Sequence, residues 1–219
     1  ILREMRKRVT VQGPISKAHG KLFWIDAGAT EFFTDWQAGP VLTEGGFWTA
    51  PGVFSADGID LASALLVEAL PDKLGNHIAD LGAGWGFLSA HLLARPQLES
   101  VHLIEASHVA LDCARHNITD PRAHFHWADA TTWKPPVRID TIVMNPPFHT
   151  GRAAEPQIGQ AFVAAAARCL APNGHLWMVA NRHLPYEAEL KTHFVEVTEQ
   201  GGDARFKICH AAKPSRRRR

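Results

Sequence analysis

Cysteine, tyrosine and long apolar runs are scarce in this chain. Its 219 residues include one tyrosine and three cysteines (Cys113, Cys169 and Cys209), and no two cysteines form a C-x-x-C pair. An odd number of scattered cysteines is typical of reduced thiols, so we expect a cytoplasmic protein without disulfides. No segment reaches the roughly 18 apolar residues of a membrane span, and no signal-peptide core is evident. We therefore expect no membrane partner.

The chain as a whole also has no large excess of positive or negative charge. The formal net charge is +1, with 46% hydrophobic and 21% charged residues, which is an ordinary composition for a domain with one full core. The basic residues are nonetheless uneven, because Arg3, Arg6, Lys7 and Arg8 open the chain and Arg216 to Arg219 close it. We interpret residues 213–219 as a solvated basic tail.

Residues 1–50 lack a clear hydrophobic rhythm. They contain a possible strand at residues 21–25 and three aromatic residues, Phe32, Phe33 and Trp36. The chain begins with Ile1 rather than methionine, so we expect a piece of a longer protein. We predict that residues 1–50 are a connector or the remnant of a truncated preceding domain, covering one edge of the core.

From residue 51 to residue 212, buried strands alternate with helices. Predicted strands lie at 78–81, 101–104, 123–127, 139–144, 175–180, 194–199 and 205–211, and predicted helices begin near 61, 87, 107, 157 and 185. The last two strands are joined by Gly201-Gly202-Asp203 and form a hairpin. Alternating β and α units predict an α/β fold with a doubly wound, mostly parallel sheet and a C-terminal antiparallel hairpin.

A glycine-rich turn follows the first of these strands, at Asp80-Leu81-Gly82-Ala83-Gly84-Trp85-Gly86. Glycines permit a tight turn and let a ligand approach the backbone closely. The spacing is G-x-G-x-G rather than the G-x-G-x-x-G of dinucleotide sites. Asp80 would repel a diphosphate but would suit a cationic amino group, which favours S-adenosylmethionine over a nicotinamide cofactor.

Acidic residues end the next two strands. Glu105 follows the turn by about 20 residues, the position from which an acid binds ribose hydroxyls. Asp129 could accept a hydrogen bond from an adenine amino group.

His124 and His126 share a strand face without an evident third ligand, so we expect packing roles and no metal. Asp57 and Asp60 lack the further oxygen ligands of a calcium loop, and helix capping is the better interpretation.

The fourth strand ends at Asn145-Pro146-Pro147-Phe148-His149. Two prolines cannot continue a central strand, so the chain leaves the sheet rigidly at its carboxyl edge. An exocyclic or amide nitrogen becomes nucleophilic when acceptors hold its N–H bonds. The Asn145 side chain and the Pro146 carbonyl could be those acceptors, and Phe148 could stack on the planar group. The alternative is a strand-ending turn.

These motifs match a known family. The chain resembles class I S-adenosylmethionine-dependent methyltransferases, and within them the bacterial small-subunit ribosomal RNA guanine-N2 methyltransferases (RsmC-like). The blocks that carry the resemblance are PGVFSADGID (51–60), DLGAGWG (80–86), NPPFH (145–149), VANRHLPY (179–186) and RFKICHA (205–211). The resemblance implies a seven-stranded Rossmann-like methyltransferase sheet, with residues 1–50 at the join to a degenerate first domain.

The resemblance also implies the site and the reaction. The cofactor S-adenosyl-L-methionine would be bound by Asp80, Gly82, Ala83, Gly84, Gly86, Glu105, Ala106, Asp129, Ala130 and Asn145. The catalytic residues would be Asn145, Pro146, Pro147 and Phe148, and the substrate would contact Phe54, Phe148 and His149. The implied function is methyl transfer to an exocyclic amino group of RNA, guanine N2 in small-subunit ribosomal RNA, with that RNA or the small ribosomal subunit as partner.

Two alternatives come from other classes. The same asparagine motif activates amides, so the chain could be a protein glutamine N-methyltransferase acting on a translation factor. It could also be a catalytically silent RNA-binding module. The PGVFS and RFK blocks and the basic ends favour RNA over protein, and two intact motifs favour an enzyme over a silent module.

Overall fold

The computed structural model describes residues 1–215 except 27, 29, 148, 151–152 and 155. The chain divides into two compact units, Ile1–Gly39 and Pro40–Arg219. The observed division therefore lies about ten residues before the predicted boundary at residue 50. The reason is a side-chain clamp: Asn117 accepts from Trp48 N at 2.6 Å and donates to Trp48 O at 2.8 Å. This clamp fixes the hairpin of β3 (Val41–Leu42) and β4 (Trp48–Thr49) to the second unit.

The first unit has no buried residue among its described positions. It consists of α1 (Leu2–Arg8), the antiparallel pair β1 (Gln12–Lys17) and β2 (Gly20–Trp24), and a 3-10 helix, η1 (Thr30–Trp36). Arg8 ties the helix to η1, because its Nη2 donates to Asp35 Oδ2 at 2.8 Å and its guanidinium lies 4.9 Å from the Trp36 ring. Surface contacts of this kind hold the unit together in place of an apolar core.

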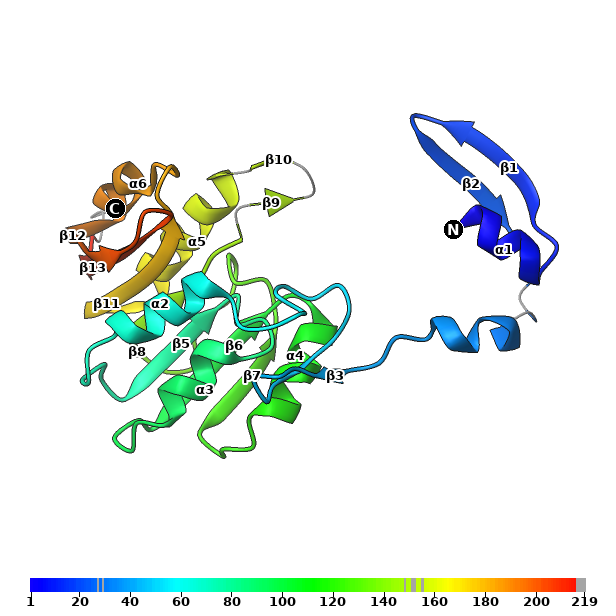
Figure 1. Ribbon diagram of the computed structural model, residues 1–219. Helices are drawn as coiled ribbons and strands as arrows, with labels where there is room; N and C mark the ends of the chain where they lie inside the picture. Colours follow the sequence, from blue (N-terminus) through cyan, green and yellow to red (C-terminus); the bar gives the residue numbers. More distant parts are fainter. Residues whose placement is uncertain (27, 29, 148, 151–152, 155, 216–219) are drawn as a thin grey trace. The chain divides into compact units, whose positions relative to one another are not determined.

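A seven-stranded sheet forms the centre of the second unit (Figure 1). Its strands, in spatial order, are β12 (Phe194–Gly202), β13 (Phe206–Pro214), β11 (Leu170–Asn181), β8 (Ile139–Met144), β5 (His77–Leu81), β6 (Ser100–Glu105) and β7 (Ala123–Trp127). The five strands from β11 to β7 are parallel, and β13 is antiparallel to both of its neighbours. The predicted fold class is confirmed, including the antiparallel insertion of the final strand.

Helices cover both faces of this sheet, as its parallel strands require. The helices are α2 (Leu61–Ala69), α3 (Phe87–Leu93), α4 (His108–Asn117), α5 (Pro156–Cys169) and α6 (Tyr186–His193), and a short hairpin of β9 (His149–Thr150) and β10 (Ala153–Ala154) precedes α5. Successive strand residues point to opposite faces. Leu103 therefore packs in the core under α2, α3 and α4, and its neighbour Ile104 packs in the core under α5 and α6.

Helix α2 begins at a side-chain cap that later matters for the site. Asp60 precedes the helix in an extended conformation, and its Oδ2 accepts from Ser63 N at 2.8 Å. The capping interpretation of Asp60 is confirmed. A cap of this kind typically stabilises a protein by about 1 kcal/mol.

Candidate active site

Two adjoining cavities open at the carboxyl edge of the parallel strands, where ligands bind in doubly wound sheets. The larger has a volume of about 390 Å³. It is lined by Phe54, Gly82, Gly84, Ile104, Glu105, Ala106, Asp129, Ala130, Asn145, Pro146, Pro147 and Phe162. The smaller, of about 40 Å³, shares four of these residues and adds Asp60 and Ser63. Most of the predicted cofactor and catalytic residues therefore come together around one space.

The glycine-rich turn exposes its backbone to this space. Gly82, Gly84 and Gly86 all have positive φ angles, of 75°, 56° and 91°. A Cβ atom added at Gly84 would meet no other atom within 4 Å, so the cavity comes directly up to the main chain there. A Cβ at Gly86 would instead lie 2.9 Å from Ile118, and Gly86 lines neither cavity. Gly86 thus allows close packing at the start of α3, and its predicted contact with the cofactor stays a prediction.

Glu105 connects two segments at the cavity wall. Its Oε2 accepts from Gly84 N at 2.8 Å, and its Oε1 accepts from Ser107 N at 2.7 Å. Each carboxylate oxygen has a second lone pair, so the group can still accept from a ligand hydroxyl. The residue predicted to bind ribose therefore also fixes the conformation of the glycine-rich turn.

Asp129 also lines the larger cavity and is exposed. Its Oδ1 accepts from the backbone N and the hydroxyl of Thr131, at 2.8 Å and 2.7 Å. The following residue, Ala130, is buried and lines the same cavity. Asp129 is held in a local turn, and its other carboxylate oxygen has no hydrogen bond to a residue that the structure describes.

Asp80 lies away from the cavity walls, although it was predicted to contact the cofactor. The residue is completely buried and lines neither cavity. Its Oδ2 accepts from Ser89 Oγ at 2.7 Å, and its Oδ1 has no hydrogen-bond partner in the described part of the chain. Burial raises the pKa of Asp80 to about 7, an effect opposed by the hydrogen bond from Ser89 and reinforced by the charge of Glu105. In this geometry Asp80 links β5 to α3 behind the turn, and direct contact with an amino group stays a prediction.

Asn145 faces both cavities and has a defined orientation. Its Nδ2 donates to Asp60 Oδ2 at 2.9 Å and to Ser63 Oγ at 3.0 Å, on the side of the smaller cavity. Only the N–H side of an amide can face a carboxylate, so the carbonyl oxygen is directed away from Asp60. Asp60 and Ser63 were not predicted as site residues; the sequence identified only the cap.

The substrate side of the site is partly described. Phe54 lines both cavities with a side chain that is 58% exposed, and its carbonyl accepts from Trp85 Nε1 at 3.0 Å. Pro146 and Pro147 line the larger cavity. Phe148 lies outside the described residues, and for His149 the backbone is described, as part of β9, but not the side chain. The predicted roles of Phe148 and His149 stay predictions.

Histidines stack across β6 and β7 away from the cavities. His102 is 3% exposed, and its Nδ1 lies 3.0 Å from His126 Nε2, with the His124 ring 4.9 Å away. Burial, with the neighbouring histidines, lowers the pKa of His102 to about 4. Within the described residues, no three His, Cys, Asp or Glu side chains form a group that could bind a metal ion. His102 therefore packs as a neutral ring at neutral pH.

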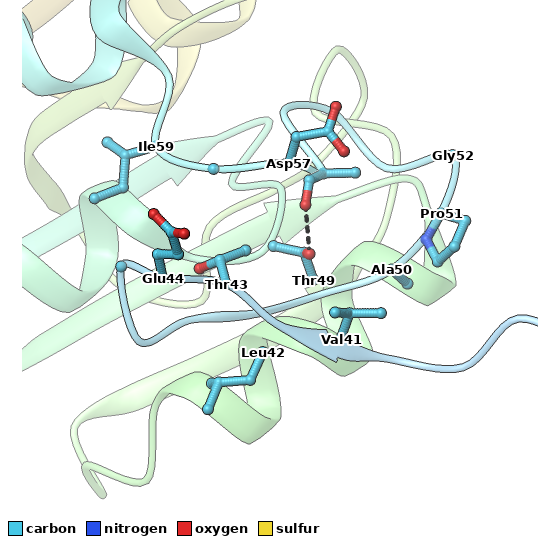
Figure 2. A pocket seen from close by; sticks show the side chains of 13 residues that line it. Val41, Leu42, Thr43, Glu44, Thr49, Ala50, Pro51, Gly52, Asp57 and Ile59 are labelled. Atoms are coloured by element: carbon cyan, nitrogen blue, oxygen red, sulfur yellow. Dashed lines mark hydrogen bonds between the residues drawn. The ribbon is translucent and has the colours of Figure 1, made fainter.

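A further cavity, of about 810 Å³, lies along the β3–β4 hairpin and the loop that follows (Figure 2). Its wall is fixed by Thr49 Oγ1, which donates to the carbonyl of Ala56 at 2.6 Å. Glu44 and Asp57 are the charged residues that line it. Two carboxylates repel phosphate, so this hollow is unsuited to an RNA backbone.

Comparisons with known proteins agree with this geometry. The family model described as "Methyltransferase small domain" matches residues 44–210. Over 168 residues the chain is 34% identical to the Ribosomal RNA small subunit methyltransferase C of Hahella chejuensis, covering 76% of this chain and 49% of that protein. Among the described residues, no helix is long and apolar enough to cross a membrane.

Solved methyltransferase structures also match the chain. A T. thermophilus 16S rRNA N2 methyltransferase (RsmC), in complex with AdoMet and guanosine, is 31% identical with a TM-score of 0.67, covering 81% of this chain and 50% of that one. Human N-acetylserotonin methyltransferase is 14% identical with a TM-score of 0.56, covering 71% of this chain and 52% of that one, and shows the fold alone. The chain spans about half the length of both RsmC relatives.

Proposed function

Because the chain belongs to the methyltransferase small domain family, we propose that it transfers a methyl group from S-adenosylmethionine to guanine N2 in small-subunit ribosomal RNA. Two relatives support this substrate: one is named a small-subunit ribosomal RNA methyltransferase, and the other was solved with AdoMet and guanosine. The partner would be that RNA or the small ribosomal subunit, encountered in the cytoplasm, without a membrane or a metal ion.

The larger cavity fits the cofactor. Open space at the Gly84 backbone admits a ligand against the main chain, and the carboxylates of Glu105 and Asp129 provide acceptors for ribose hydroxyls and an amino group. Ile104, Ala130 and Phe162 provide apolar walls for a planar base. When bound there, S-adenosylmethionine supplies an electrophilic methyl group.

One observation carries the proposal: the amide of Asn145 is fixed by Asp60 and Ser63. Its Nδ2 is engaged on the side of the smaller cavity, and its carbonyl oxygen accepts from no other residue that the structure describes, so this oxygen could accept an N–H from a substrate in the larger cavity. The Pro146 carbonyl would accept the second N–H. An amino group held by two acceptors keeps its lone pair directed at the incoming methyl group.

Positioning and electrostatics would then supply most of the rate. Acceptors that are already oriented need no reorganisation when positive charge develops on the nitrogen. No strong base is required, because the proton leaves after the nitrogen has been methylated. A guanine in folded RNA must be unpaired or extruded to reach the site, at a cost of a few kcal/mol.

Transfer of a labelled methyl group tests the proposal and its alternatives. The chain is incubated with labelled S-adenosylmethionine and with either small ribosomal subunits or a release factor as acceptor. We expect label in ribosomal RNA, recovered as N2-methylguanosine. Label in glutamine of the release factor would instead establish a protein methyltransferase. RNA binding without any transfer would establish a silent module.

A further inference from the structure

Another cavity lies at the same edge of the sheet as the candidate active site, one strand away from it. It has a volume of about 490 Å³ and is lined by Asn181, Arg182, His183, Ala204, Arg205 and Phe206. We name it the Arg205 pocket. It brings together two blocks of the sequence, residues 179–186 and 205–211, to which the proposed reaction assigns no role.

The sheet register places this pocket near Asn145. Met144 of β8 pairs with Met178 of β11, and Asn181 of β11 pairs with Phe206 of β13. Neighbouring strands lie about 4.8 Å apart and rise about 3.3 Å per residue, so the Asn181 and Asn145 backbones are separated by roughly 8 Å. That span is comparable to one nucleotide step along a single strand.

Arg182 lines the pocket and is held in place by hydrogen bonds. Its Nε donates to Asp203 O at 2.9 Å, its Nη1 to Glu199 Oε1 at 2.9 Å and its Nη2 to Phe206 O at 3.1 Å. Asp203 Oδ1 in turn accepts from Arg205 N and Phe206 N, both at 2.7 Å. These bonds fix the turn at residues 203–206, and they engage each nitrogen of the Arg182 guanidinium.

The Lys207 side chain is also engaged in contacts within the fold. The side chain is almost completely buried, and its Nζ donates to Leu184 O at 2.7 Å and to the Glu187 carboxylate. These contacts fix the turn after β11 that carries His183. Lys207 therefore supports the pocket from behind and offers no charge to it.

Arg205 is different from both. It is exposed, its guanidinium lies 5.4 Å from the centre of the Phe206 ring, and it forms no ion pair with any residue that the structure describes. The carboxylates of Glu199 and Asp203 do not line the pocket, so the charged side chains that do line it are cationic. A planar guanidinium held over an aromatic ring is suited to bind a phosphate through two N–H donors.

We propose that the Arg205 pocket binds a backbone phosphate of the substrate RNA next to the nucleotide to be methylated, with Arg205 as the phosphate ligand. This inference rests on the proposed function, because it takes RNA as the substrate. The Arg205 guanidinium contacts the non-bridging phosphate oxygens, and the Asn181 and His183 side chains line the same space. The pocket thereby sets the register of the strand relative to Asn145.

Binding measurements with two ligands test this site. The full chain and its variants are titrated with a short fluorescent single-stranded RNA that has a central guanine, at several salt concentrations, and separately with guanosine, which has no phosphate. We expect Arg205→Ala to weaken RNA binding about tenfold and to reduce the salt slope by about 0.7. Affinities for guanosine and S-adenosylmethionine should not change.

The matched control is Arg138→Ala. Arg138 is exposed and lies just before β8, at the opposite edge of the sheet, so its removal makes the same charge change away from the pocket. We expect Arg138→Ala to leave RNA affinity within about twofold of wild type, and Arg205→Lys to lose less than Arg205→Ala. Thermal unfolding of each variant confirms that it is folded.

Three results would overturn the proposal: wild-type RNA affinity and salt slope in Arg205→Ala, an equal loss in Arg138→Ala, or a comparable loss of guanosine binding in Arg205→Ala. Failure of the proposed function is seen separately. If wild type transfers no methyl group to RNA but its RNA affinity still depends on Arg205 and not on Arg138, the phosphate site stands and the proposed reaction is wrong.

Discussion

Asn145 and Asp60 are 85 positions apart in the chain and are joined by a hydrogen bond of 2.9 Å between Asn145 Nδ2 and Asp60 Oδ2. The same Asp60 oxygen caps α2 by accepting from Ser63 N. One carboxylate therefore starts a helix and orients the amide that faces the ligand cavity. The two functions can be separated by substitution.

We predict that Asn145→Ala lowers kcat for methyl transfer by about 100-fold or more, in the range of one lost transition-state contact. The contact strengthens as the nitrogen becomes pyramidal, so the loss should fall on kcat rather than on cofactor affinity. Steady-state kinetics and calorimetry measure the two quantities. Near wild-type turnover on a substrate that the parent methylates would show that the motif is only a turn.

For Asp60 we expect a smaller, separable effect. Asp60→Ala should lower kcat about tenfold and destabilise the fold by about 1 kcal/mol through the lost cap. Asp60→Ser keeps a cap oxygen but removes the carboxylate that holds Asn145, so stability should recover while kcat stays low. Asp60→Asn keeps an oxygen at both contacts and should retain most activity. Equal kcat in all three variants would contradict the orienting role.

Glu105 holds the glycine-rich turn and lines the cofactor cavity. We predict that Glu105→Ala weakens S-adenosylmethionine binding by about 1–3 kcal/mol, because two backbone N–H groups lose their acceptor. Glu105→Gln should lose nearly as much, since only one of its two side-chain atoms can accept from Gly84 N or Ser107 N. Calorimetry checks both variants. Glu68→Ala, an exposed change on α2, is the control and should bind as wild type does.

Asp80 should make stability depend on pH. An unfolded aspartate titrates near 3.8, and the folded group titrates at about 7, so the folded state loses stability as pH rises between these values. The full loss would be roughly 4 kcal/mol if Asp80 acted alone. Asp80→Asn cannot ionise, so its stability relative to wild type should increase from pH 4 to pH 8 in urea unfolding. A difference that does not vary with pH would show that Asp80 is charged in the fold.

His102 should act in the opposite direction. Its pKa is about 4 when folded and 6.5 when unfolded, so stability is lost as pH falls through this window, by up to about 3 kcal/mol. We predict that His102→Gln removes this acid loss and His116→Gln, an exposed control on α4, does not. As pH rises, Asp80 lowers the stability of the fold and His102 raises it. The stability of either single variant should therefore depend more steeply on pH than that of wild type. This role of His102 would be excluded if the difference in unfolding free energy between His102→Gln and wild type were the same at pH 4 and pH 6.5.

The strands and helices of the second unit were predictable from local patterns. Strands such as β8, with both faces buried, appear as apolar runs, and the caps at Asp60 and Ser107 mark helix starts. Glu105, Asp129 and Asn145, which were predicted to meet at the carboxyl edge, line one cavity there, and their roles toward a ligand stay predictions. These features depend on contacts within a few residues, or on a topology that the β/α alternation dictates.

Other features depended on contacts that no local pattern contains. The role of Asp60 toward Asn145 joins segments from different β/α units, and the boundary at Gly39 depends on the clamp between Asn117 and Trp48. Asp80 is an intermediate case. Strand alternation places it on the same face as Ile78, toward the core under α2, α3 and α4, so its burial could have been predicted from its register.

The 85-residue separation between Asp60 and Asn145 also has a consequence for folding kinetics. Because closing a contact between distant segments costs chain entropy, we expect the contact between Asp60 and Asn145 to form after the parallel pairing of β5 with β8. The acceptor for the amino group should therefore become oriented only after β5 and β8 have paired. During refolding, cofactor binding at Glu105 and the glycine-rich turn, which are about 20 residues apart, should recover before methyl transfer does.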